Sequence, residues 1–398
     1  MKLALITAYP PSKVTLNEYG YHLAKQFAQK PEVDELVLIT DHTKEPKQID
    51  FNTDNCKVSV KESWNFNSYK NIYSIYKNVV KQKPDAILFN LQFMKFGDKK
   101  IPAALGLLLP LLFRLKGIPT IVLLHNILEQ VDLGNAGFTQ NKFLQKLYNM
   151  MGTGLTKVLL QADTVALTIG KYVDVIKDKY KAENVMQVPH GSFETPPEPN
   201  FDLPEGPKKI MTFGKFGTYK KVDILIEAVE KLRERTNQEL EIVIAGTDSP
   251  NTPGYLAGVM KKYDHVRNLT FTGYVEEEDV PVIFGESTLV AFPYTSTTGS
   301  SGVLHQAGSY GKAVVMPNLG DLALLVEEEG YVGEFFEPGN VDSLADSMEK
   351  IIENDLHRRT IGEVNYDAAC SLPMEKIAQL YLDEFQKLLR AKMNLNFV

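Results

Sequence analysis

Residues 209–221, KIMTFGKFGTYKK, contain the unit from which the rest of the fold can be worked out. The apolar run at residues 209–213 predicts a short buried strand, and a helix is expected to open near Lys221. Gly214 lies between the two and allows a close approach of another backbone. A strand, a tight turn and a helix in this order are typical of a parallel sheet covered by helices.

The same unit recurs along the chain, because short runs rich in Val, Ile and Leu alternate with segments of helical length. This alternation predicts parallel β-α-β units in both halves. The expected strands are Lys2–Thr7, Glu35–Ile39, Ala86–Asn90, Thr120–His125, Thr164–Leu167 and Val185–Val188, then Lys209–Phe213, Glu241–Ala245, Leu269–Thr272, Thr288–Phe292 and Ala313–Met316. The expected helices include Asn17–Gln29, Gly170–Tyr180, Lys221–Thr236, Gly302–Tyr310 and an amphipathic tail at 373–392.

A proline-rich stretch separates the two halves. Prolines at 196, 197, 199, 204 and 207 exclude a helix or a central strand there. The predicted fold class is therefore α/β, with two doubly wound domains at residues 1–190 and 209–375 and a linker at 191–208. In such sheets ligands bind beyond the carboxyl ends of the strands, so two facing domains would place a site in the cleft.

Composition excludes several classes of protein. Of the 398 residues, 44% are hydrophobic and 23% are charged, which is ordinary for a globular chain. The net charge of −7 disfavours a nucleic-acid-binding protein. Two cysteines suit a reducing compartment, so we expect a cytoplasmic protein. The apolar stretch 101–115, flanked by basic residues, predicts either a helix buried against a sheet, which is favoured, or a helix on the inner membrane surface.

Two loops of the second domain have the composition of an anion site. Lys215, Lys220 and Lys221 cluster where a helix begins, which suits a phosphate, although solvated surface lysines would have the same sequence. Residues 293–304, PYTSTTGSSGVL, offer hydroxyl groups and backbone N–H groups at a second helix start, or simply a serine cap. Together the two loops predict a diphosphate site. The sequence contains no Walker motif, no nucleophile elbow and no His-Glu-x-x-His zinc motif.

Two histidines are expected at the carboxyl edge of the first sheet. His125 ends a predicted strand and precedes Asn126, and His190 follows the strand at 185–188. A histidine in that place can donate to a sugar hydroxyl or share charge with a phosphate. A lone histidine is more often structural, so both interpretations stay open.

Taken together, these segments resemble glycosyltransferase family four, whose members are retaining enzymes of the GT-B fold that use nucleotide sugars. The resemblance covers nearly the whole chain, and no single motif is specific by itself. It is carried by residues 9–13, 124–126, 188–191, 213–220, 272–275 and 333–340.

The resemblance implies transfer of a sugar from a UDP- or GDP-linked donor to a saccharide or lipid-linked acceptor, as in polysaccharide biosynthesis, with retention and without a metal or other cofactor. It also implies that the tail, residues 376–398, packs back on the first domain. The implied sites are the following: His125 as the catalytic-site residue at the donor sugar; Lys215, Lys220, Ser301, Gly302 and Val303 at the diphosphate; Thr298 and Gln306 at the donor sugar and ribose; Gly273, Tyr274 and Val275 at the nucleobase; Lys13, Asn126, His190 and Gly214 in the cleft.

The sequence departs from the family pattern at several of these positions. Lys13 and its neighbours stand where the family has a pair of glycines, and Lys215 replaces an arginine. Thr298 and Gln306 stand where the family has glutamates. These departures leave open a non-catalytic GT-B accessory or sugar-nucleotide-binding protein, or other GT-B chemistry such as a sugar-nucleotide epimerase or a phosphorylase.

Overall fold

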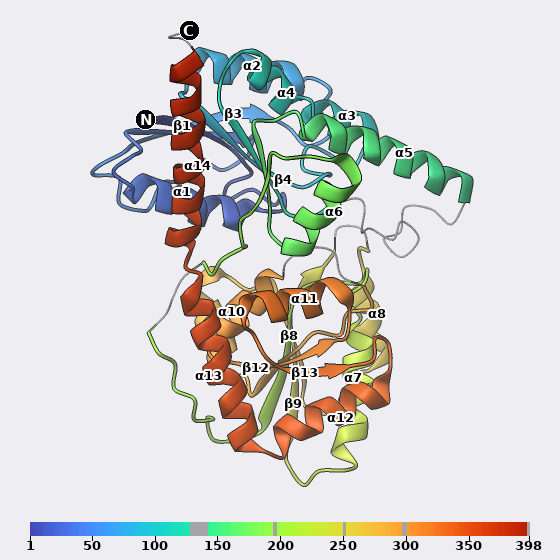
Figure 1. Ribbon diagram of the computed structural model, residues 1–398. Helices are drawn as coiled ribbons and strands as arrows, with labels where there is room; N and C mark the ends of the chain where they lie inside the picture. The colour runs from blue at the N-terminus through green and yellow to red at the C-terminus, as the bar shows by residue number, and fades with distance from the viewer. Residues whose placement is uncertain (128–141, 194–196, 250–251, 297–300, 396–398) are drawn as a thin grey trace. The chain divides into compact units, whose positions relative to one another are not determined.

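The computed structural model describes residues 1–127, 142–193, 197–249, 252–296 and 301–395. These residues form two compact units (Figure 1). Unit 1 contains the described residues up to 193 together with 374–395, and unit 2 contains those from 197 to 373. Within the described ranges, no helix has the length and apolar character needed to cross a bilayer.

Unit 1 is built on a parallel sheet of 7 strands in the order β3-β2-β1-β4-β5-β6-β7. Its inner strands are buried on both faces, which explains why they are almost continuously apolar. The strands are β1 Lys2–Ile6, β2 Glu35–Asp41, β3 Lys57–Trp64, β4 Ala86–Leu91, β5 Thr120–Leu124, β6 Thr164–Leu167 and β7 Val185–Gln187.

Helices cover both faces of this sheet. Right-handed crossovers put α1 on one face and α2 to α6 on the other. The tail helix α14 packs beside α1, where the rings of Phe27 and Tyr381 lie 6.4 Å apart, so the predicted amphipathic tail helix and its return to the first domain are confirmed. The helices are α1 Asn17–Gln29, α2 Asn71–Gln82, α3 Lys100–Gly106, α4 Leu109–Leu115, α5 Lys142–Leu159, α6 Gly170–Tyr180 and α14 Met374–Leu395.

Unit 2 repeats this architecture around a sheet of 6 parallel strands in the order β10-β9-β8-β11-β12-β13. The chain starts at β8 in the middle, builds outward through β9 and β10, and then crosses back to β11 on the other side of β8. The strands are β8 Lys208–Phe216, β9 Leu240–Asp248, β10 Leu269–Gly273, β11 Leu289–Ala291, β12 Ala313–Pro317 and β13 Glu334–Phe336.

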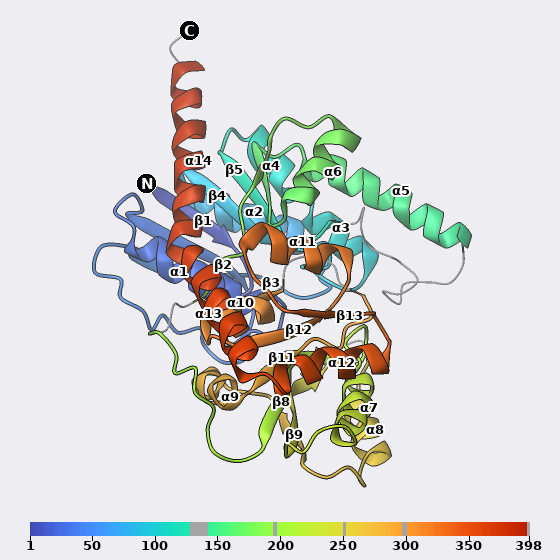
Figure 2. The ribbon, with the colours of Figure 1, turned by 60° about the horizontal axis from the view of Figure 1, so that its bottom comes forward.

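Right-handed crossovers also decide which face of the unit 2 sheet each helix covers. Helices joining strands up to β10 lie on one face, those joining the later strands lie on the other, and α12 packs beside α7 (Figure 2). The two parallel sheets confirm the predicted α/β fold class. The helices are α7 Val222–Arg233, α8 Tyr255–Lys262, α9 Val280–Glu286, α10 Gly302–Ser309, α11 Gly320–Glu329, α12 Val341–Ile352 and α13 Asp355–Ser371.

The structure differs from the sequence prediction in three places. Strands β3 and β13 lie at sheet edges and were not predicted, because β3 is largely polar and β13 spans only 3 residues. The stretch 101–115 forms two short helices rather than one. Pro110 lies in the first turn of α4, and Gly106 at the end of α3 packs so tightly on Phe96 that a Cβ would approach its ring to 2.1 Å.

Candidate functional site

Three glycines line the carboxyl edge of the unit 2 sheet. Gly214 on β8, Gly246 on β9 and Gly273 on β10 are cross-strand neighbours, with φ values of 132°, 139° and 71°. A Cβ at Gly246 would lie only 1.9 Å from the Gly214 carbonyl oxygen. Only glycine fits at position 246, because its backbone conformation and this contact both exclude a side chain. The edge therefore presents bare backbone to a ligand.

The two predicted anion loops meet beside this edge. Lys220 and Tyr294 form an antiparallel bridge, and the N–H of Thr295 donates to the Tyr219 carbonyl at 2.8 Å. The N–H of Lys221 donates to the carbonyl of residue 293 at 2.9 Å. The bridge lies between β8 and β11, where the order of the strands reverses. Ligands of doubly wound sheets bind at such switch points.

Two of the three clustered lysines are placed to meet an anion there. Lys215 is exposed at the end of β8. The Lys220 side chain is half-buried, with Nζ 4.6 Å from the centre of the Tyr294 ring and close above Gly214. Burial lowers the pKa of Lys220, and a bound anion would oppose that shift. Lys221 points elsewhere, because its Nζ donates to the Gly217 carbonyl at 3.2 Å.

Helix α10 begins next to these loops. Ser301 is its N-cap, and its hydroxyl accepts from the Leu304 N–H at 3.4 Å. The N–H groups of Gly302 and Val303 belong to the first turn, which has no intrahelical acceptors for them. Gln306 is half-buried on the same helix. Thr298, predicted at the donor sugar, lies outside the described residues.

The predicted nucleobase turn follows β10. Gly273 takes a left-handed conformation, and Tyr274 is 64% exposed. The N–H of Gly246 lies 3.3 Å from the Thr272 hydroxyl oxygen, so this turn is tied to the glycine edge. A planar base could contact the turn through backbone groups or stack on the Tyr274 ring.

In unit 1 the two predicted histidines lie in one cluster around Tyr19. Its ring centre is 4.6 Å from that of His125 and 4.8 Å from that of His190, and the two imidazoles are 5.8 Å apart. Both histidines are buried at the carboxyl edge of the sheet. Burial lowers the pKa of His125 well below its usual value and lowers the pKa of His190 to about 4. Both imidazoles are therefore neutral at pH 7.

The proton of His125 can be placed from its partner Asn90. The Asn90 amide nitrogen donates to the Thr7 hydroxyl at 2.9 Å and to the Leu16 carbonyl at 3.3 Å. Its Oδ1 therefore faces Nε2 of His125, 2.7 Å away, and must accept from it. Since the ring is neutral, Nδ1 of His125 is the acceptor nitrogen. Asn90 was not predicted, although a polar residue at the end of an apolar strand was the available signal.

Other predicted residues of unit 1 lie on or near the first loop. Lys13 is exposed, and Asn126, directly after His125, is half-buried. A lysine that was not predicted, Lys95, is buried beneath the loop and donates to the Thr15 carbonyl at 2.8 Å. Burial lowers the pKa of Lys95 to about 7. Its charge also contributes to the low pKa of His125.

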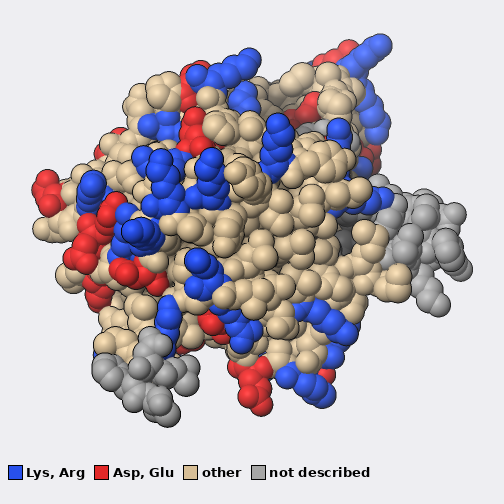
Figure 3. All heavy atoms as spheres, turned by 90° about the horizontal axis from the view of Figure 1, so that it is seen from above, with Lys and Arg blue, Asp and Glu red and all other residues tan. Residues whose placement is uncertain are grey.

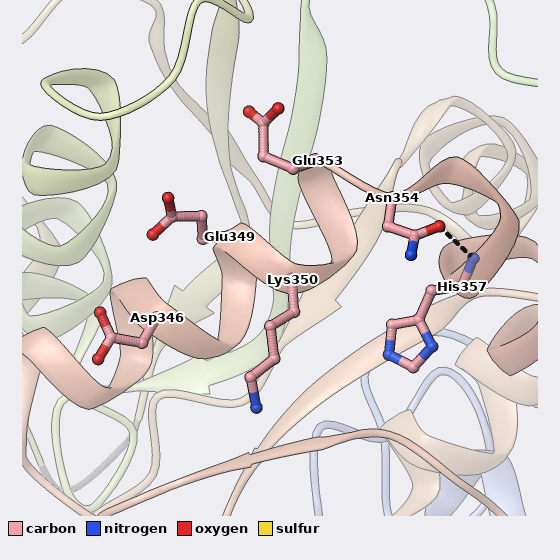
Figure 4. A pocket seen from close by; sticks show the side chains of 6 residues that line it. All are labelled: Asp346, Glu349, Lys350, Glu353, Asn354 and His357. Atoms are coloured by element: carbon pink, nitrogen blue, oxygen red, sulfur yellow. Dashed lines mark hydrogen bonds between the residues drawn. The ribbon is translucent and has the colours of Figure 1, made fainter.

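A separate depression of about 560 Å³ on unit 2 lies between α12 and α13 and contains none of these residues (Figure 4). Its acidic side chains are already engaged, since Asp346 and Glu349 both pair with Arg235. Within the described residues, no group of three or more His, Cys, Asp or Glu side chains could hold a metal ion. Lys350 and His357 of the same depression both pair with Glu334. The depression is lined by Asp346, Glu349, Lys350, Glu353, Asn354 and His357.

Comparison with known proteins agrees with this geometry. Sucrose-phosphate synthase from Thermosynechococcus elongatus has the same fold, with a TM-score of 0.72 at 16% identity over 98% of this chain and 100% of that one. HepE from Anabaena, solved with UDP and glucose, has a TM-score of 0.67 at 17% identity over 97% and 100%. WaaG, a glycosyltransferase of lipopolysaccharide biosynthesis, has a TM-score of 0.66 at 13% identity over 96% and 99%. No curated protein sequence matches the chain.

The fold is therefore that of the GT-B glycosyltransferases. Residues 197–367 match the family described as "Glycosyl transferases group 1". The matched segment includes both anion loops, the glycine edge and the turn after β10. The resemblance drawn from the sequence motifs is confirmed.

Proposed function

We propose that the protein is a retaining glycosyltransferase that moves a sugar from a nucleoside diphosphate sugar to a saccharide or lipid-linked acceptor, without a metal. The observation that carries the proposal is the bridge between Lys220 and Tyr294, which joins the two anion loops of the glycosyltransferase segment. The bridge brings Lys220 and the start of α10 toward one bare backbone edge. A diphosphate is the ligand that this combination suits best.

The proposed chemistry needs a stabilised leaving group. In the transition state the sugar–phosphate bond breaks and negative charge grows on the nucleoside diphosphate. Lys215 and Lys220 would neutralise that charge, with N–H groups from Gly302 and Val303 adding donors. His125 would accept from a hydroxyl of the donor sugar through Nδ1. In a front-face mechanism the acceptor attacks on the side the leaving group departs from, and no protein nucleophile is required.

Gln306 and Thr298 set this chain apart from the family pattern. A glutamine can still hydrogen-bond ribose hydroxyls, but it is a weaker acceptor than a carboxylate. This observation supports a second candidate, a non-catalytic GT-B protein that binds a sugar nucleotide. We expect either protein to act in the cytoplasm, since Cys56 and Cys370 are both free.

The first experiment is a thermal-shift titration with UDP, GDP and ADP, each with EDTA and with magnesium. HepE has been solved with UDP, so UDP is the first ligand to try. Stabilisation by one nucleoside diphosphate, equal in EDTA and magnesium, would support the donor site. Absence of a shift with all of them would contradict it.

The second experiment follows the anomeric configuration by NMR when the matching sugar nucleotide is incubated with candidate acceptors. Product with the configuration of the donor would support a retaining transferase. Inverted product would contradict that assignment. Nucleotide binding without any turnover would favour the non-catalytic protein.

A further inference from the structure

One face of unit 1 has a charge pattern unlike the rest of the chain. Residues 65–84 and 99–117, which we call the basic face, contain eight lysine or arginine residues and no aspartate or glutamate. The chain as a whole has 50 acidic and 43 basic residues. The basic residues are Lys70, Lys77, Lys81, Lys83, Lys99, Lys100, Arg114 and Lys116, and all are exposed.

The two segments are brought together by the fold. They carry α2, α3 and α4, which lie on the same face of the sheet and contact one another. In the view from above, several Lys and Arg side chains stand among broad uncharged surface, and Asp and Glu side chains lie mainly to one side (Figure 3). The positive charges therefore belong to one continuous surface of unit 1.

Large apolar side chains are exposed between these charges. Leu115 is 74% exposed, Tyr73 67% and Ile101 60%. A groove of about 440 Å³ runs between α2 and α4, and Tyr73, Leu112 and Leu115 are among its lining residues. Monomeric proteins seldom leave aromatic and aliphatic side chains clustered in this way without a partner.

We propose that the basic face binds to the surface of an anionic lipid bilayer. Of the eight basic residues, Arg114 pairs with Asp163 at 3.7 Å, and the two segments still carry an excess of positive charge. Such an excess is attracted to anionic headgroups, and exposed Leu, Ile and Tyr side chains can enter the boundary between headgroups and acyl chains. Helices α3 and α4 have 7 residues each, so they would lie on the bilayer and not span it. The proposal does not depend on the proposed glycosyl transfer.

The test is co-sedimentation of the full chain with vesicles of phosphatidylcholine alone and of phosphatidylcholine with one third phosphatidylglycerol. We expect binding only to the anionic vesicles, and weakening at high salt. K77E/K116E should lower the affinity by about 30-fold or more, since two attractions become repulsions. L115S should lower it by about fivefold through lost apolar contact.

The matched control is K376E/K387E on α14, which makes the same charge change on the opposite face of the unit 1 sheet. It should bind within about twofold of the unchanged chain, because only the basic face meets the lipid. All variants should keep their melting temperature and their response to nucleotide.

Failure of the unchanged chain to bind anionic vesicles would overturn the proposal. Equal losses in K77E/K116E and the control would also overturn it, since net charge alone would then explain binding. So would binding to single-stranded RNA, used as a competing polyanion, that is tighter than binding to vesicles and is lost in K77E/K116E. Unchanged lipid binding in K77E/K116E would overturn it too, whatever the variant's response to nucleotide.

Discussion

The two candidate sites hold their polar groups in opposite ways. In unit 1, the imidazoles of His125 and His190 are buried, neutral and packed around Tyr19. In unit 2, the site consists mainly of bare backbone at the glycine edge, with Lys215 exposed and Lys220 half-buried. Because the imidazoles of unit 1 are packed and buried, we expect the stability of that unit to change with pH. Because the site of unit 2 consists of backbone and accessible lysines, we expect changes in those lysines to affect ligand binding and activity more than stability.

Substitution of Gly246 should have the largest effect, and it tests whether the fold of unit 2 requires a bare backbone at the glycine edge. G246A should destabilise unit 2 by about 4 kcal/mol, from the strain of a positive φ together with overlap with the Gly214 carbonyl. Urea unfolding followed by circular dichroism measures the loss. G254A is the matched control, because Gly254 has a φ of 84° but nothing within 4 Å of an added Cβ. It should cost about 1 kcal/mol, and equal losses would contradict the close approach.

His190 tests the coupling of unit 1 to pH. Its pKa is about 4 in the folded chain and 6.5 when exposed, so the unfolded chain binds more protons between these values. Stability should therefore fall as pH falls from 6.5 to 4, by about 3 kcal/mol from this residue. H190Q should flatten the curve in that window. H265Q in unit 2 is the matched control, because it removes an imidazole that is exposed rather than buried.

The result that would contradict this coupling is an unchanged pH profile in H190Q. His125 shares the environment and would add to the slope in both chains, because burial also lowers its pKa. H125Q/H190Q should consequently give the flattest profile of the series between pH 4 and 6.5.

Substitution of the lysines of unit 2 should lower activity with little loss of stability. K215A and K220A should each lower kcat/KM for the sugar nucleotide about 100-fold, because each removes a cation from the departing diphosphate. K220A should cost little stability, and K215A none that unfolding measurements detect. Steady-state kinetics and thermal melts on the same samples separate the two effects.

K261A is the charge-matched control for these variants. Lys261 lies in the last turn of α8, which runs back from the carboxyl edge of the sheet toward the opposite edge. The K261A variant should have the same activity as the unchanged chain. Full activity in both K215A and K220A would end the assignment of the diphosphate to these side chains.

Sequence reasoning located the parts of the fold and site that depend on local pattern. The central strands are apolar runs, and the loops at Lys220 and Ser301 each join a strand to a helix, so both were visible in the sequence. The bridge from Lys220 to Tyr294 and the hydrogen bond from His125 to Asn90 join residues far apart in the chain. They depend on how strands pair in the sheet, which no local pattern encodes.

Hydrogen exchange with and without saturating UDP tests the central claim, that unit 2 holds the nucleotide through backbone. The account predicts slower amide exchange at residues 214–221, 273–275 and 301–304, which contain the glycine edge, the anion loops and the turn after β10. It predicts no slowing at residues 120–126, where His125 is already buried. Slowing confined to unit 1, or none anywhere, would contradict it.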